Sequence, residues 1–317
     1  MAITLAEAKV LTQDKLAQII IDEFRQDRLL DMMIFDNTVT PQGQSLAYIY
    51  NRVTTLSTAG FRAINSEYVA QEAKTTQITS NLKVFGGSFN VDRVIQNHVR
   101  GIADQVSFQM QQKIKATKAV FADAFFNGDS AVNTNSFDGI DKAITGSSTE
   151  LVPDAVIDLS TSAAMDTNFK SFMDMLDKML SNLDGTPTVL GMNRIMAAIM
   201  NGIARRSNYF SSSDVDAFGK PVLKYAGIPI YEVGDKPGTS NSIIGIDATA
   251  KTTSIFAMRV GLDGVHAASP EGDQLIKHYL PDMTLPGAVK TGEVEMVATA
   301  ALKATRAAGA LRKIKVQ

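Results

Sequence analysis

One long stretch, Val91–Asn127, constrains the fold of this 317-residue chain more than any other. Apolar residues recur along it at helical spacing, with polar residues between them. The apolar positions are Val91, Ile95, Val99, Ile102, Val106, Met110, Ile114, Phe121, Ala124 and Phe125. Asn90 or Asp92 can cap its start, and Asn127-Gly128 can end it in a left-handed turn. A helix over the whole range is about 50 Å long at a rise of ~1.5 Å per residue. A helix of this length can belong to a coiled coil, to a large bundle, or to a spine with layers of structure laid along it. We expect the spine.

The segment before this helix has the composition of extended structure. In residues 46–90, Thr, Ser, Val, Tyr and Asn dominate, as is typical of strands. We expect a hairpin whose long arms are 48–55 with 64–69, and then 75–91, with a bend at Gly60. An isolated two-stranded hairpin is marginal in water. This one is therefore either an ordinary edge of a sheet or an extended loop that overlaps a neighbouring subunit.

The far end of the chain predicts a long strand that suits the helix. Within 293–305 apolar and polar residues alternate, and the apolar set is Val294, Met296, Ala298, Ala300, Leu302 and Ala304. Such a strand is about twice the usual length of five to six residues. A long strand and a long helix can cover each other's apolar stripes. In the second hairpin arm, Gly86-Gly87 indicates a bulge or a close approach of another backbone.

The middle of the chain predicts a mixed α/β region. We expect helices at 166–183 and 193–204, and strands at 151–158, 186–191, 223–233, 242–246 and 253–260, with a Gly-Ile-Pro turn inside 223–233. Elsewhere we expect an amphipathic helix at 12–33, a strand at 273–279, a Pro/Gly-rich loop at 280–291 and a short strand at 311–316. This alternation of helices and strands indicates a separate domain around a central sheet.

Composition excludes several classes of protein. The net charge of −2 gives no electrostatic case for a nucleic-acid or membrane surface. The absence of cysteine excludes disulfides, thiolate metal sites and cysteine nucleophiles. The first residues, MAITLAEAKV, lack the basic start and apolar core of a signal peptide. No apolar run approaches the roughly 20 residues of a membrane span.

Catalytic and ligand-binding motifs are missing from the sequence. Gly219-Lys220 lacks the upstream glycine of a phosphate-binding loop, and no zinc-protease, serine-hydrolase or dinucleotide-binding motif is present. The only histidines, His98, His266 and His278, do not have metal-ligand spacing. The carboxylate pairs Asp214/Asp216 and Glu293/Glu295 lie in polar or exposed contexts. We therefore expect no catalytic residue, no metal, no cofactor and no enzymatic activity.

The order of these parts resembles the major capsid proteins of tailed bacteriophages, which have the Hong Kong 97 fold. The resemblance covers nearly the whole chain. Its most specific stretch runs from TTQITSNLKVFGGSFNVDRVI through the long helix to AFFNGDSAVNTNSFDGI. The final EMVATAALKATRAAGALRKIKV is similar to the long peripheral strand of that family and its return to the axial domain.

The resemblance implies an α+β capsid fold with a spine helix, long strands and an extended hairpin, the E-loop. It divides the chain into an N-terminal arm with an amphipathic helix at 1–45, the E-loop at 46–90, a peripheral domain with the spine helix at 91–150, a mixed α/β axial domain at 151–260, a peripheral return and loop at 261–305, and a short strand back to the axial domain at 306–317.

The function that the resemblance implies is assembly. Identical chains would form pentamers and hexamers that close into an icosahedral head around double-stranded DNA, inside the host cytoplasm, and would remain in the virion capsid. The implied partners are the chain itself, a portal, a separate scaffold or decoration proteins, and packaged DNA through weak non-specific contact, with no membrane. The expected contacts between subunits are Phe61, Arg62, Tyr68, Lys74, Lys83, Arg93, Pro281 and Pro286.

Two further readings stay open. Some relatives crosslink through an E-loop lysine, and Lys74 and Lys83 lie in the matching segment, but no partner carboxylate or asparagine can be assigned. An encapsulin, a nanocompartment shell with the same fold, is the first alternative function. A soluble enzyme with no recognisable catalytic motif is the second.

Overall fold

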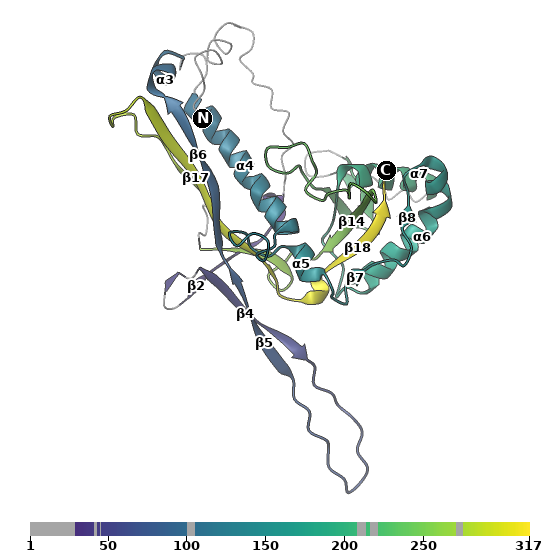
Figure 1. The fold of residues 1–317 in the computed structure, drawn as a ribbon. Coiled ribbons are helices and arrows are strands. Elements are labelled where there is room, and N and C mark those ends of the chain that lie inside the picture. Colours follow the sequence, from purple (N-terminus) through teal and green to yellow (C-terminus); the bar gives the residue numbers. More distant parts are fainter. Residues whose placement is uncertain are drawn as a thin grey trace.

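The computed structural model describes residues 29–40, 43–44, 46–99, 105–207, 214–215, 221–270 and 275–317. Figure 1 shows an elongated part, with a helix lying along long strands, joined to a rounded lobe, and a hairpin that projects away from both. The division of the chain into a peripheral and an axial domain stays a prediction.

Strand β17 (Val289–Leu302) organises the elongated part. It pairs antiparallel with β6 (Lys83–Asp92) along that strand's whole length, from Val289↔Asp92 to Ala298↔Lys83. It also pairs with β16 (Ile276–Tyr279) and β15 (Val265–Ser269), and β1 (Phe35–Asn37) lies parallel to β15. The expected alternation is confirmed, because the side chains from Val294 through Leu302 on the apolar face are buried.

Gly86 explains how β6 and β17 approach each other. A Cβ atom at this position would collide with the carbonyl oxygen of Val294 on the paired strand. Only glycine can therefore occupy this point of the ladder without moving a backbone. The expected close approach at Gly86 is confirmed.

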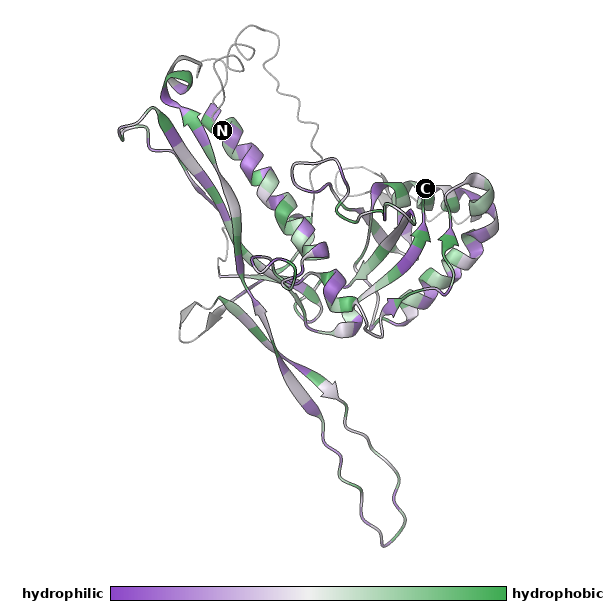
Figure 2. Cartoon of the chain, viewed as in Figure 1, coloured by the Kyte–Doolittle hydropathy of each residue, from purple (hydrophilic) through white to green (hydrophobic). Residues whose placement is uncertain are grey.

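Helix α4 (Gln105–Asn127) covers this sheet with its C-terminal half. Phe121, Phe125 and Phe126 are fully buried, and the Phe121 ring lies 6.2 Å from Phe85 of β6 and 5.9 Å from Phe137. Figure 2 shows apolar residues gathered toward this end of α4 and more polar residues toward its start. The burial of these rings is what holds the helix against the strands.

The expected single helix over 91–127 is wrong at its start. Val91 and Asp92 are the last residues of β6, since their pairing with Lys290 and Val289 continues the sheet. Helix α3 (Arg93–Val99) follows, and the Asp92 carboxylate accepts a hydrogen bond from Val94 N at 2.7 Å. The expected cap at Asp92 is confirmed for α3. Helix α4, with its 23 residues, is about 35 Å long at ~1.5 Å per residue.

The lobe is built on a seven-stranded sheet whose order is β12-β13-β9-β14-β18-β7, with β8 also paired to β18. These strands are β7 (Glu150–Leu151), β8 (Ile157–Asp158), β9 (Val189–Met192), β12 (Lys224–Tyr225), β13 (Ile228–Glu232), β14 (Thr252–Met258) and β18 (Ala308–Lys315). Helices α6 (Ser162–Ser181) and α7 (Arg194–Ser207) bury Phe172, Leu176 and Met196 against one face. The other face shares a continuous core with α4 and β17, in which Phe126 packs on Phe256.

The smaller elements complete the described chain. They are α2 (Leu29–Met32), β2 (Val39–Thr40), β3 (Gly43–Gln44), β4 (Ala47–Thr55), β5 (Lys74–Asn81), α5 (Ile140–Ile144), β10 (Asp214–Val215), β11 (Pro221–Val222) and the 3-10 turn Thr305–Ala307. Most of the expected helix at 12–33 lies outside the described residues, and α2 is helical at its end. Arg312 of β18 ties α5 and β7 to the lobe through Asp141 and Glu150, at 2.5 and 2.9 Å.

Four local expectations are wrong, and one of them is the left-handed turn after α4, since neither Asn127 nor Gly128 has a positive φ angle. Residues 64–69 form no strand, and 242–246 form a loop in which Ile243 N donates to Gly234 O at 3.0 Å. The expected Gly-Ile-Pro turn lies one residue earlier, at Ala226-Gly227, where both φ angles are positive, 49° and 81°. Pro229 instead pairs within β13. The sequence did not predict strand β15, because all five of its residues are buried and apolar and polar positions therefore do not alternate along it.

The two phenylalanines Phe121 and Phe61 offer a matched test of this core. Phe121→Ala should lower the free energy of unfolding by about 3–5 kcal/mol, because it empties a fully buried site between α4 and the sheet. Phe61→Ala, at a fully exposed position, should change it by less than about 0.5 kcal/mol. Urea unfolding of the unassembled chain measures both, and similar losses for the two variants would contradict this core.

Candidate assembly interface

A two-stranded hairpin projects from the body of the subunit (Figure 1). Strands β4 and β5 pair antiparallel from Ala47↔Asn81 to Thr55↔Lys74. Beyond them, the chain from 56 to 73 forms a long loop in which every residue is exposed. We name β4 and β5 the stem and residues 56–73 the tip. The expected hairpin of 46–90 is therefore shorter, because 83–92 belong to β6 and the sheet of β17.

The stem is anchored to the C-terminal end of β17. Tyr50 donates a hydrogen bond to Leu302 O at 3.0 Å. Arg52 donates to Lys303 O at 2.9 Å through Nε, and to Leu302 O through Nη2. Tyr48 is buried in a small apolar cluster with Leu82, Ala268 and Ala301. The stem thus packs against the body of its own subunit, and this contact supplies the stability that an isolated two-stranded hairpin lacks.

A polar cluster closes this anchor. The Tyr48 hydroxyl donates to Asp36 Oδ2 at 2.5 Å, and His266 Nε2 lies 3.1 Å from the same hydroxyl. Lys303 Nζ lies 3.7 Å from Asp36 Oδ2 and 5.3 Å from the centre of the Tyr48 ring. We name Asp36, Tyr48, His266 and Lys303 the root cluster. It joins β1, the stem, β15 and the residue that follows β17.

The root cluster shifts the pKa of its members in opposite directions. Burial, and then the hydrogen bond to Asp36, raise the pKa of Tyr48 well above its usual range. Burial acts to raise the pKa of Asp36, but the bonds from Tyr48 and Asn37 and the nearby Lys303 outweigh it and lower that pKa. Burial, and then Lys303, lower the pKa of His266. At neutral pH the cluster therefore holds an ionised Asp36 beside a neutral imidazole.

The tip and the outer face of the stem expose apolar side chains to solvent. These are Leu46, Ile49, Val53, Leu56, Phe61, Ile64, Tyr68 and Val69. Among the described residues, the hydrogen bonds of 56–73 stay inside the tip, for instance Arg62 Nη1 to Ser66 O at 3.0 Å. The Arg62 guanidinium also lies 5.3 Å from the centre of the Tyr68 ring. Grouped apolar side chains on such a projection are typical of a surface that another protein covers.

The expected contact residues do not form one site. Phe61, Arg62 and Tyr68 lie together on the tip, and Lys74 begins β5 at its base. Lys83 is turned to the body, where its Nζ donates to Thr134 O at 2.6 Å.

The other expected contacts are spread over the elongated part. Arg93 is exposed at the start of α3. In the loop before β17, Pro286 is exposed but Pro281 is buried, so Pro281 offers little surface to a neighbour. The buried Lys290 holds this loop by donating to the carbonyl oxygens of Leu285 and Pro286. A role in subunit contacts stays a prediction for each of these residues.

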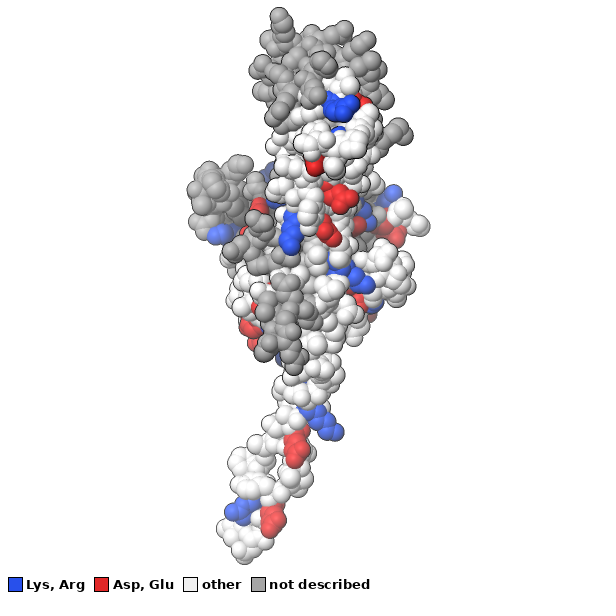
Figure 3. Space-filling model, turned by 90° about the vertical axis from the view of Figure 1, so that its left-hand side faces the viewer, with Lys and Arg blue, Asp and Glu red and all other residues white. Residues whose placement is uncertain are grey.

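Charge is mixed on this surface. Figure 3 shows acidic and basic side chains interspersed along the hairpin and over the face above it. Among the described residues on that face, charges of one sign form no large patch. Affinity for a nucleic-acid backbone depends on gathered lysines and arginines, so the hairpin is better suited to a protein partner.

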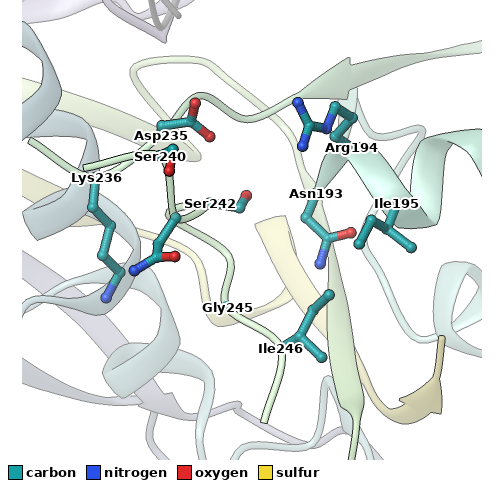
Figure 4. A pocket seen from close by; sticks show the side chains of 10 residues that line it. Asn193, Arg194, Ile195, Asp235, Lys236, Ser240, Ser242, Gly245 and Ile246 are labelled. Atoms are coloured by element: carbon teal, nitrogen blue, oxygen red, sulfur yellow. The ribbon is translucent and has the colours of Figure 1, made fainter. Parts of the chain in front are cut away.

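A polar cavity of about 470 Å³ lies in the lobe, between the start of α7 and the loop 235–246 (Figure 4). Asn193 Oδ1 accepts from Met196 N at 2.8 Å, so this side chain caps the helix. Lys236 pairs with Asp123 of α4 at 3.7 Å. The residues that line the cavity include no histidine, and the described chain holds no group of acidic, histidine or cysteine side chains suited to a metal. The cavity carries no recognisable catalytic arrangement.

Among the described residues, no helix has both the length and the apolar character required to cross a bilayer.

Replacing Arg52 tests the anchor of the stem. Arg52→Met should raise amide hydrogen exchange in 47–55 and 74–81 by at least tenfold, since it removes charged bonds to two carbonyls, each worth ~1.5–3 kcal/mol. Arg62→Met is the matched control, because the bonds of Arg62 stay within the tip. Equal exchange in the two variants would show that Arg52 does not hold the stem. Mass spectrometry of the full chain gives the rates.

Comparison with known proteins identifies the fold. Residues 150–291 match the family model described as "Type 2A encapsulin shell protein SrpI-like", and no curated protein matches the chain. The SrpI encapsulin of Synechococcus elongatus has a similar structure, with a TM-score of 0.67 at 12% identity over 99% of this chain and 97% of its own. The capsid of a native GTA particle gives 0.66 at 14% identity over 98% and 97%. The capsid of Myoviridae Phage XM1 gives 0.60 at 10% identity over 96% and 97%. The chain therefore has the Hong Kong 97 fold that tailed-phage capsid proteins and encapsulin shell proteins share.

Proposed function

We propose that this chain is a structural shell subunit that assembles with copies of itself into a closed particle. Its fold is that of capsid and encapsulin subunits over nearly the full length of both chains. A structural, non-enzymatic role agrees with these matches, whose titles name an encapsulin and capsids. It also agrees with the sequence, in which no catalytic motif occurs.

The hairpin is the observation that carries this proposal. Its stem is anchored on its own subunit, but its tip exposes Phe61, Ile64 and Val69 far from the body. A second copy of the chain is the partner that a shell always supplies. A hairpin that meets a different surface on the next copy makes a heterologous contact, and such contacts generate rings and closed shells when the rotation closes.

We propose that the shell is the head of a tailed phage. Pentamers and hexamers would close into an icosahedral head around double-stranded DNA, with a portal and a separate scaffold or decoration proteins as partners. The E-loop of this subunit would be the hairpin of β4 and β5, the peripheral domain would hold α4 and β17, and 151–260 would form the axial domain. The net charge of −2 supports only weak, non-specific contact with the packaged DNA. The protein would assemble in the host cytoplasm and remain in the virion.

An encapsulin-type compartment is the second candidate. The family match over 150–291 favours it, because the matched description is that of an encapsulin shell. The contents of purified particles distinguish the two candidates. Nuclease-protected DNA supports the phage head, and a co-purifying enzyme in place of DNA supports the compartment.

Removing the tip tests the shell function. A variant in which Asn-Gly replaces 56–73 should fold with the same unfolding midpoint, since the tip is exposed and makes its hydrogen bonds internally. It should fail to form closed shells in electron micrographs under conditions in which the unaltered chain forms them. The double variant Glu67→Gln and Glu72→Gln, which keeps the apolar tip, is the control and should still assemble.

Two results would contradict the proposal. An unaltered chain that remains a small, discrete oligomer under all assembly conditions would rule out the shell function. A tip deletion that unfolds the subunit would show that 56–73 belongs to its own core.

A further inference from the structure

We propose that the root cluster is an acid-sensitive latch, in which proton uptake by His266 releases the β4–β5 stem from the body of the subunit. The latch acts on the orientation of the hairpin within one chain. It is therefore independent of what the assembled particle contains, and it is testable on the unassembled chain.

The hydrogen bonds of the root cluster show which ring nitrogen of His266 carries no proton at neutral pH. The Tyr48 hydroxyl has one proton, which it donates to the ionised Asp36 at 2.5 Å. His266 Nε2, 3.1 Å from the same oxygen, must then be the donor of that contact and carry the ring proton. The other nitrogen, Nδ1, is buried and receives no hydrogen bond, since the backbone group that faces the ring is the carbonyl of Gly264, an acceptor. Acid would place the second proton on this buried Nδ1.

The surroundings of His266 disfavour that second proton. The side chain is completely buried, and the Lys303 cation acts against a second positive charge. The groups that favour the imidazolium are the Gly264 carbonyl and the carboxylates Asp36 and Asp263. Asp263 is already paired with Arg259 at 2.5 Å. Asp36 already accepts a hydrogen bond from Tyr48 and pairs with Lys303.

Two further groups face the cluster from the stem. They are the ring of Tyr50, 5.9 Å from that of Tyr48, and Arg52, a second cation beside Lys303. Neither supplies the negative charge that an imidazolium would require. Burial and Lys303 outweigh the favourable groups, and the pKa of His266 is lowered from its usual 6.5.

The latch must therefore weaken as the pH falls. In the released stem, His266 would be hydrated and would titrate near its usual 6.5, whereas in the closed latch it binds its proton only at a lower pH. Between these two values, the released state holds one more proton than the closed state. Asp36 stays ionised in that window, because its own pKa is lowered from 3.8. The closed state is therefore fully favoured above pH 6.5 and loses stability below it.

Hydrogen exchange of the full chain between pH 5.0 and 7.5 tests the latch. After correction for the intrinsic pH dependence of exchange, the opening constant of the stem should rise as the pH falls below 6.5, by at most tenfold per pH unit for one proton, and level off below the lowered pKa of His266. Peptides covering 47–55 and 74–81 report the stem, and peptides from β9 and β14 report the axial core, which should not respond. A stem whose exchange does not depend on pH in this range would overturn the proposal.

Two histidine variants assign the effect. His266→Gln keeps an N–H that can donate to Tyr48 but cannot titrate, so it should abolish the pH dependence. His278→Gln makes the same change at an exposed position of β16 and should leave it unaltered. A pH dependence that survives His266→Gln, or disappears with His278→Gln, would contradict the latch.

A second measurement decides the matter if His266→Gln does not fold. Proton NMR of the imidazole resonances in the unaltered chain, assigned with His278→Gln and His98→Gln, should give His266 a titration midpoint below 6.5, at the pH where the rise in stem exchange levels off. A midpoint at or above 6.5 would overturn the proposal.

Discussion

The antiparallel pairing of β6 with β17 is the constraint on which the rest of the subunit depends. It runs from Val289↔Asp92 to Ala298↔Lys83, and Gly86 keeps the two backbones close. On one face the pair supports the phenylalanines of α4. Beyond it, the end of β17 receives the stem of the hairpin through Leu302 and Lys303. The spine helix and the hairpin are therefore positioned by the same strand.

Much of the fold could be predicted from local patterns. The alternation in 293–305 and the apolar spacing toward Phe125 both report burial directly, because one face of each element is covered. The start of the helix was misplaced because Val91 and Asp92 suit a helix equally well, and only their pairing with β17 decides for the strand. Strand β15 had no signal to find, since burial on both faces removes the alternation.

Part of the candidate interface could be predicted from the sequence, and part of it could not. The hairpin could be predicted in part, because residues 46–90 hold few large aliphatics for a core of their own, but the strand expected at 64–69 is absent. The root cluster could not, since Tyr48 and His266 are 218 positions apart and neither belongs to a motif. The side chain of Lys83 was expected at a subunit contact, but its bond to Thr134 O turns it to the body, which no spacing rule predicts.

The position of β18 in the lobe has a consequence for synthesis. This strand lies inside the seven-stranded sheet, between β14 on one side and β7 and β8 on the other, yet it is made after all the other strands of that sheet. While the ribosome is still extending the chain, the sheet has a gap in its interior, and Ile255 and Leu159 lack the strand that covers them. The lobe therefore completes its core only after β18 has been synthesised, which delays the exposure of its finished surface to other growing copies.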